Sequence, residues 1–121
     1  SQAGNDNLGG TSTDMDSTIT AYSSSAGNEV GNSGSYSAGG GTLPSQTVSG
    51  SQTQTTAFVD FGEMTFTSAT ITARGALIYN DTNSDKAVCV LDFGSDKSSS
   101  SGQFQVVFPS PDTSSAIIRI A

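Results

Sequence analysis

Apolar and polar side chains alternate in a series of short segments, most of them in the second half of the chain. Six segments carry such alternation or a compact apolar run: residues 57–61, 64–67, 69–79, 86–93, 103–108 and 116–120. Neighbouring side chains of a strand point to opposite faces, so alternation predicts a strand with one buried face. Within residues 69–79, Ile71, Ala73, Leu77 and Tyr79 are predicted to share that face.

The segments between these strands carry turn residues. Residues 80–85 and 109–112 are rich in Asn, Asp, Ser and Pro, and residues 94–102 are predicted to form a serine-rich loop. Arg74-Gly75 interrupts its apolar segment, which predicts a bulge or a close backbone approach. Residues 87–91 are apolar on both faces, as expected for a strand in the middle of a sandwich.

Short strands separated by turn signals every 8 to 12 residues or so predict an all-β fold. We expect a single antiparallel β-sandwich, either jelly-roll or immunoglobulin-like, over residues 13–121. The first half is dominated by Ser, Gly, Thr and Asn, with short predicted strands at residues 18–22, 28–30 and 42–48. Residues 1–12 have only Leu8 as an apolar anchor and are predicted to be a flexible N-terminal arm.

Composition limits the size of the core and the kinds of partner. Hydrophobic residues make up 33% of the chain, so the core is thin and burial against a partner would add to its stability. The formal net charge is -7, and the four basic residues are scattered, which argues against a nucleic-acid partner. No apolar run approaches the roughly 20 residues of a membrane helix, so we expect no membrane partner.

The chain lacks the usual residues of catalytic sites. It has no histidine, and Cys89 is its single cysteine. A nucleophilic Cys89 would need a base beside it, so a buried, inert thiol is expected. We therefore predict no catalytic, cofactor-binding or metal-binding residues, and a protein that is not an enzyme.

Three groups of residues were weighed as candidate sites. Asp81, Asn83 and Asp85 alternate as in a calcium loop and Asp92 falls at its twelfth position, but Lys86 replaces the glycine needed at the sixth, so a hairpin turn is expected. Asp14 and Asp16 are a carboxylate pair of the kind that serves acid-base hydrolysis, but a solvated loop is expected there. The run Gly39-Gly40-Gly41 lacks the lysine of a phosphate loop and is interpreted as a turn.

Several blocks of the sequence resemble a family of small virion structural proteins of tailed bacteriophages. The blocks are residues 66–80, 87–97, 102–109 and 116–121, with 20–22, 28–30 and 36–43 upstream. The resemblance covers about residues 17 to 121, and the first residues lack the apolar opening strand of the family pattern.

The resemblance implies a non-enzymatic virion protein. Within that class we expect a capsid decoration (cement) protein that binds the major capsid protein on the outside of the shell and forms a homo-oligomer or symmetric array there. The alternative is a tail or fibre component that contacts other virion proteins or the host surface. The N-terminal arm and the segments 81–85 and 97–101 are the expected interface residues.

Overall fold

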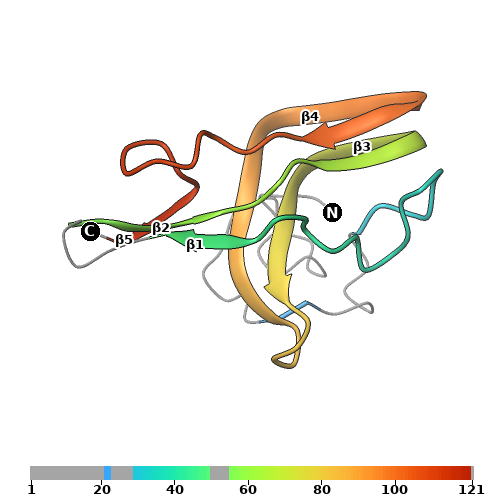
Figure 1. Cartoon of the computed structure of the whole chain (residues 1–121). Helices are drawn as coiled ribbons and strands as arrows, with labels where there is room; N and C mark the ends of the chain where they lie inside the picture. The colour runs from blue at the N-terminus through green and yellow to red at the C-terminus, as the bar shows by residue number, and fades with distance from the viewer. Residues whose placement is uncertain (1–20, 23–28, 50–54, 121) are drawn as a thin grey trace. The chain divides into compact units, whose positions relative to one another are not determined.

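The computed structural model describes residues 21–22, 29–49 and 55–120. Five strands are present: β1 (Thr47–Ser49), β2 (Ala57–Asp60), β3 (Met64–Asn80), β4 (Lys86–Val106) and β5 (Ile118–Ile120). They form a two-stranded sheet of β3 and β4 and a three-stranded sheet in the order β1-β2-β5, both antiparallel (Figure 1). No helix occurs among the described residues, so the all-β prediction is confirmed. The predicted arm, residues 1–12, lies outside them.

The described residues divide into two compact units that interleave along the chain. Unit 1 contains the described residues up to Gly40 together with Thr67–Phe104. Unit 2 contains Gly41–Phe66 and the residues from Gln105 onward. The described residues contain no helix that could span a membrane.

Unit 1 is built on the long hairpin of β3 and β4 (Figure 1). Its buried apolar side chains are those of Tyr36, Ala69, Ile71, Ala73, Ile78 and Phe104. The strand β3 continues through Arg74-Gly75, but the buried positions shift there from Ala73 and Gly75 to Ile78. The prediction that Leu77 and Tyr79 share the buried face was therefore wrong. After Gly75 the fully buried position is Ile78, and Leu77 and Tyr79 are only half-buried.

The serine-rich segment at residues 94–102 was predicted to be a loop, and that prediction was wrong. It is part of β4. The hydroxyl of Ser99 donates a hydrogen bond to the Ala69 carbonyl at 2.9 Å and accepts one from the Ile71 amide at 3.3 Å. Hydroxyl groups from this segment thus bond to β3 in a strand that lacks an alternating apolar pattern.

The segment 87–91 was predicted to be a strand in the middle of a sandwich. The two-stranded sheet gives β4 only β3 as a neighbour among the named strands, and Val88 is 51% exposed. A compact apolar run is thus not evidence for a central strand, because one strand partner and partial cover suffice for its half-buried positions.

A tight turn at residues 33–36 lies against β3. The Ser35 amide donates to the Thr67 carbonyl at 3.0 Å, and the Ser35 and Ser33 hydroxyls accept from the amides of Thr67 and Thr70, both at 2.8 Å. Gly34 has φ +58, and a Cβ atom there would lie 2.3 Å from the Thr67 carbonyl oxygen. The close approach of this turn to β3 therefore requires glycine.

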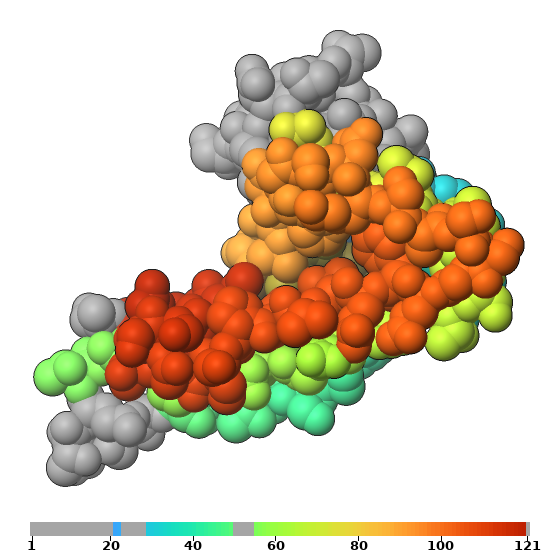
Figure 2. All heavy atoms as spheres, turned by 90° about the horizontal axis from the view of Figure 1, so that it is seen from above, coloured from blue at the N-terminus to red at the C-terminus, as the bar shows by residue number. Residues whose placement is uncertain are grey.

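Unit 2 contains the three-stranded sheet and the segment that leads into β5. The Phe61 and Phe108 rings pack with centroids 5.4 Å apart. Asp112 Oδ1 accepts hydrogen bonds from the amides of Ser114 and Ser115, which closes the predicted turn after Pro111. Seen from above, the C-terminal residues (red) lie over β1 and β2 (Figure 2).

Replacing Ser99 with alanine should lower the free energy of unfolding by about 1–2 kcal/mol, because the Ile71 amide and the Ala69 carbonyl each lose a partly buried partner. Ser100→Ala is the matched control in the same strand, at an exposed side chain, and should change stability by less than about 0.5 kcal/mol. Urea titration measures both. Equal effects would show that the Ser99 hydroxyl does not hold the two strands together.

Candidate functional site

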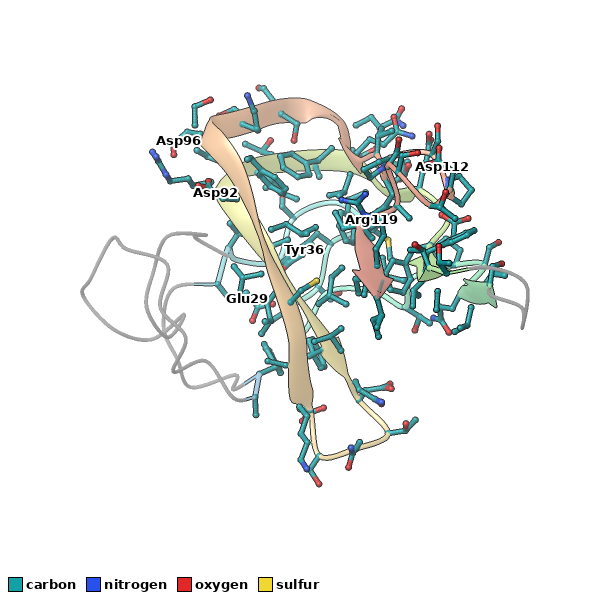
Figure 3. The ribbon with its side chains drawn as sticks, turned by 90° about the vertical axis from the view of Figure 1, so that its left-hand side faces the viewer. Glu29, Tyr36, Asp92, Asp96, Asp112 and Arg119 are labelled. Carbon is teal, nitrogen blue, oxygen red and sulfur yellow. The ribbon has the colours of Figure 1, made fainter. Side chains whose placement is uncertain are left out.

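The structure places the described candidate residues in a turn and at exposed strand positions, not together in a site. Residues 81–85 form the hairpin turn between β3 and β4, as predicted, with the Thr82 amide and hydroxyl bonded to Asn80 Oδ1. Asp92 and Asp96 occupy exposed positions along β4 (Figure 3). Among the described residues, no three Cys, Asp or Glu side chains are grouped so that they could hold a metal ion. Asp14 and Asp16 lie outside the described residues.

Cys89 and the glycine run also have ordinary surroundings. Cys89 is half-buried in β4, and this burial raises the pKa of its thiol. Gly39 and Gly40 have φ of +96 and +80, and the Gly40 amide donates to the Ser37 carbonyl at 2.8 Å. The run is therefore a turn, as predicted. Residues 97–101, an expected interface loop, lie in the strand β4 instead.

A carboxylate that the sequence did not single out organises unit 1. Glu29 accepts hydrogen bonds from the Tyr22 hydroxyl at 2.9 Å and the Tyr36 hydroxyl at 2.7 Å. It also accepts one from the Gly39 amide at 2.6 Å. Figure 3 shows Glu29 and Tyr36 in this part of the molecule. We call Glu29, its partners Tyr22, Tyr36 and Gly39, and the neighbouring Tyr79 the tyrosine cluster.

The third tyrosine of the chain completes this cluster. The Tyr79 hydroxyl donates to the Gly39 carbonyl at 2.6 Å, and its ring stacks on Tyr22 with centroids 4.7 Å apart and an interplanar angle of 12°. All three tyrosines of the protein thus meet around one glutamate. The cluster joins the turns before residue 41 to the end of β3, since Tyr79 is the next-to-last residue of that strand.

Burial and the neighbouring carboxylates keep these tyrosines protonated. Burial and then the hydrogen bond to Glu29 raise the pKa of Tyr22 to about 12. The same two causes raise the pKa of Tyr36 above its ordinary value, and burial followed by Asp85 and Glu29 raises that of Tyr79. A tyrosine held neutral donates its hydroxyl proton to a partner, so the cluster is suited to holding the fold together rather than to removing protons.

The sequence carries one signal that could have found this cluster. Glu29 is the only acidic residue between positions 17 and 59, in a segment that also contains Tyr22 and Tyr36. An isolated carboxylate near two tyrosines indicates a buried hydrogen-bond acceptor. Its link to Tyr79, 50 positions further along the chain, requires the fold.

The three-stranded sheet of unit 2 has two faces of opposite character. Val48 pairs with Val59, and Val59 pairs with Ile118, so these three side chains form one row on the same face. Ala57 and its partner Ile120 lie two residues further along on that face. We call these five side chains the apolar face. The opposite face carries Thr47, Ser49, Phe58, Asp60 and Arg119.

Part of the opposite face contacts the segment that precedes β5. The Arg119 guanidinium donates to the Ser114 carbonyl, and Thr56, Thr113, Ile117 and Arg119 line an open hollow of about 440 Å³. In Figure 1 the segment that precedes β5 arches over one side of this sheet. On the apolar face, Val48 is 78% and Ile120 72% exposed. Val59 and Ile118, at the middle of the apolar face, are half-buried.

Comparisons with known proteins give no relative for this chain. No protein-family model matches it, and neither a curated protein nor a solved structure was found to be similar to it.

Replacing Glu29 with glutamine should destabilise the protein by about 1–2 kcal/mol. Three hydrogen bonds lose their charged acceptor, and at least one is lost outright, because the amide NH2 that replaces one carboxylate oxygen donates and cannot accept. The matched control is Glu63→Gln, which removes an exposed carboxylate bonded to a single side chain, that of Gln105. Its effect should stay below about 0.5 kcal/mol. Urea unfolding at pH 7 compares the two, and an equal loss would contradict the role of Glu29.

The tyrosine cluster should also make stability fall at alkaline pH. Above the ordinary tyrosine pKa of about 10, the unfolded chain releases protons that the folded chain retains. The stabilisation that comes from these raised pKa values is therefore fully present below about pH 10. It is lost as the pH rises toward the pKa of Tyr22 in the folded protein, about 12. Urea unfolding between about pH 8 and pH 11.5 should show the stability of Tyr36→Phe converging on that of the wild type. Every other titrating group is common to both proteins, so a constant difference would refute this linkage.

Proposed function

We propose that this protein is a structural, non-enzymatic component of a tailed-phage virion, and most specifically a capsid decoration protein on the outer surface of the shell. The resemblance of residues 17 to 121 to small phage virion proteins supplies the class. The observation that carries a binding role is the apolar face of unit 2, with Val48 and Ile120 largely exposed. Apolar side chains gathered on an exposed face are typical of protein interaction sites.

Other features of the chain support a structural role. The buried apolar side chains of the described residues are few, and three of the seven are alanines. Contact with further molecules would add to the burial seen among the described residues. We include in the proposal that the fold is a single β-sandwich, that the major capsid protein is the partner, and that copies are arrayed symmetrically on the shell. Many weak contacts on a lattice add up through multivalency.

The alternative is a tail or fibre component. The exposed turn at residues 81–85 and the hydroxyl-rich segment of β4 favour it, because loops of Asp, Asn, Ser and Thr offer hydrogen bonds to polar host-surface groups. Gold-labelled protein imaged on intact virions separates the two roles, since label confined to the tail supports the alternative alone.

Purified protein should co-sediment in stoichiometric amounts with phage shells that lack it, and should raise the temperature at which those shells disrupt. Shells that already carry the protein are the control and should bind no more. Removal of residues 1–12 tests the proposed arm, and unchanged binding would exclude it from the interface. Shells that neither bind the protein nor gain heat resistance would refute the decoration role.

A further inference from the structure

We infer that Tyr22 and Tyr79 are a site of oxidative modification, at which a strong one-electron oxidant joins the two rings in a covalent dityrosine cross-link. The oxidant belongs to the class of peroxide-activated haems and photo-excited metal complexes, and the protein supplies the pair of phenols. Both tyrosines belong to unit 1, so the site lies within a single compact unit. It is independent of the proposed function and needs no partner other than the oxidant.

The two rings are stacked in a way that brings the atoms that couple close together. Their centroids are 4.7 Å apart and their planes differ by 12°. Both hydroxyl groups are at the same end of the stack, because a Cβ atom built on Gly39 would lie 3.8 Å from each hydroxyl oxygen. Dityrosine forms through the ring carbons next to the phenol oxygens. Rings stacked with their hydroxyls at one end place those carbons side by side, whereas a head-to-tail stack would place them at opposite ends.

Contacts of the backbone and of the side chains hold this pair in place. The Tyr22 amide donates to the Asp85 carbonyl at 2.8 Å, and the Tyr22 hydroxyl donates to Glu29 at 2.9 Å. Tyr79 lies within β3, and its hydroxyl donates to the Gly39 carbonyl at 2.6 Å. Reacting groups that are already oriented in the folded state couple far more readily than groups that must meet by diffusion.

Glu29 provides a place for the proton that the oxidation of Tyr22 releases. Burial and then the hydrogen bond to Glu29 raise the pKa of Tyr22 to about 12, so its phenol is protonated at neutral pH. A phenol that has lost an electron is a strong acid, and its proton moves along the existing hydrogen bond to Glu29 Oε2. A positive charge on a half-buried ring, which would be costly, is thereby avoided.

The coupling is a two-electron oxidation in which atoms and charges balance. Each ring gives one electron to the oxidant and loses its phenol proton, that of Tyr22 to Glu29 and that of Tyr79 to water, which leaves two neutral phenoxyl radicals. The radicals form one carbon–carbon bond between the rings. Each coupled carbon then releases its ring proton, and a proton returns to each phenol oxygen as the rings become aromatic again. The product lacks two hydrogen atoms, and two equivalents of the oxidant have each gained one electron.

The cross-link would act on this chain as a disulfide acts on other small proteins. Cys89 is the single cysteine, so the chain can form no internal disulfide. A bond between residues 22 and 79 closes a loop in the unfolded chain, which lowers the conformational entropy of that state and stabilises the fold. It would make covalent the tie between the turns before residue 41 and the end of β3 that the tyrosine cluster forms by hydrogen bonds.

Oxidation of the dilute full chain at neutral pH by a photo-excited ruthenium–bipyridine complex with persulfate tests this inference. The monomeric product should show dityrosine fluorescence and a mass lower by two hydrogen atoms, and its peptide map should join Tyr22 to Tyr79. Tyr22→Phe and Tyr79→Phe should each abolish this product. Tyr36→Phe is the matched control, because it removes another phenol bonded to Glu29 but keeps the stacked pair, and it should still cross-link.

The oxidised wild-type chain should also unfold at a higher urea concentration than the untreated chain. Oxidation in concentrated urea should give far less of the monomeric cross-link, because the rings are then no longer stacked. A monomeric product without dityrosine overturns the inference. So does a peptide map that joins Tyr36 to either of the other tyrosines in place of the expected pair, or a yield that is the same in urea. All of these results come from the wild-type chain, so a variant that fails to fold leaves the test intact.

Discussion

The scarcity of large apolar side chains is the constraint on which the rest of this structure depends. Of the seven buried apolar residues in the part of the chain that the structure describes, three are alanines, whose burial contributes little to the hydrophobic stabilisation. Long strands must then be held by other means. In unit 1 these are hydroxyl groups bonded to backbone and a carboxylate bonded to three donors. Each such bond adds only about 1 kcal/mol, but the groups would be costly to leave unpaired once they are partly buried.

This constraint explains which parts of the fold could be predicted from the sequence. The predicted strand at residues 57–61 is β2 to within one residue, because an apolar run bounded by glycine is a strong local signal. Residues 94–102 lacked that signal and were assigned to a loop. Ser99 instead holds two backbone groups of β3, 28 and 30 positions away. A strand that is held to its neighbour by serine hydroxyls shows no alternation of apolar and polar residues from which it could be predicted.

The tyrosine cluster and the apolar face show the same limit for the candidate site. Glu29 and Tyr79 are 50 positions apart, and only the fold brings Gly39 between them. The apolar face depends on register, since Val48, Val59 and Ile118 form a row only when β1, β2 and β5 pair in that order. Each of these segments was recognisable as apolar, but the sequence did not indicate which of their residues would share a face.

A small uncharged face on a strongly acidic chain has a physical logic under the proposed role. Repulsion between copies of charge -7 acts over roughly one Debye length, about 8 Å at physiological salt, and keeps dilute copies apart. The apolar face acts only at contact, because hydrophobic burial begins when water is expelled. Free molecules would then remain separate, while molecules held side by side on a shell would meet at a high effective concentration. The apolar face would thus form few contacts in dilute solution and more contacts between molecules that are held close together.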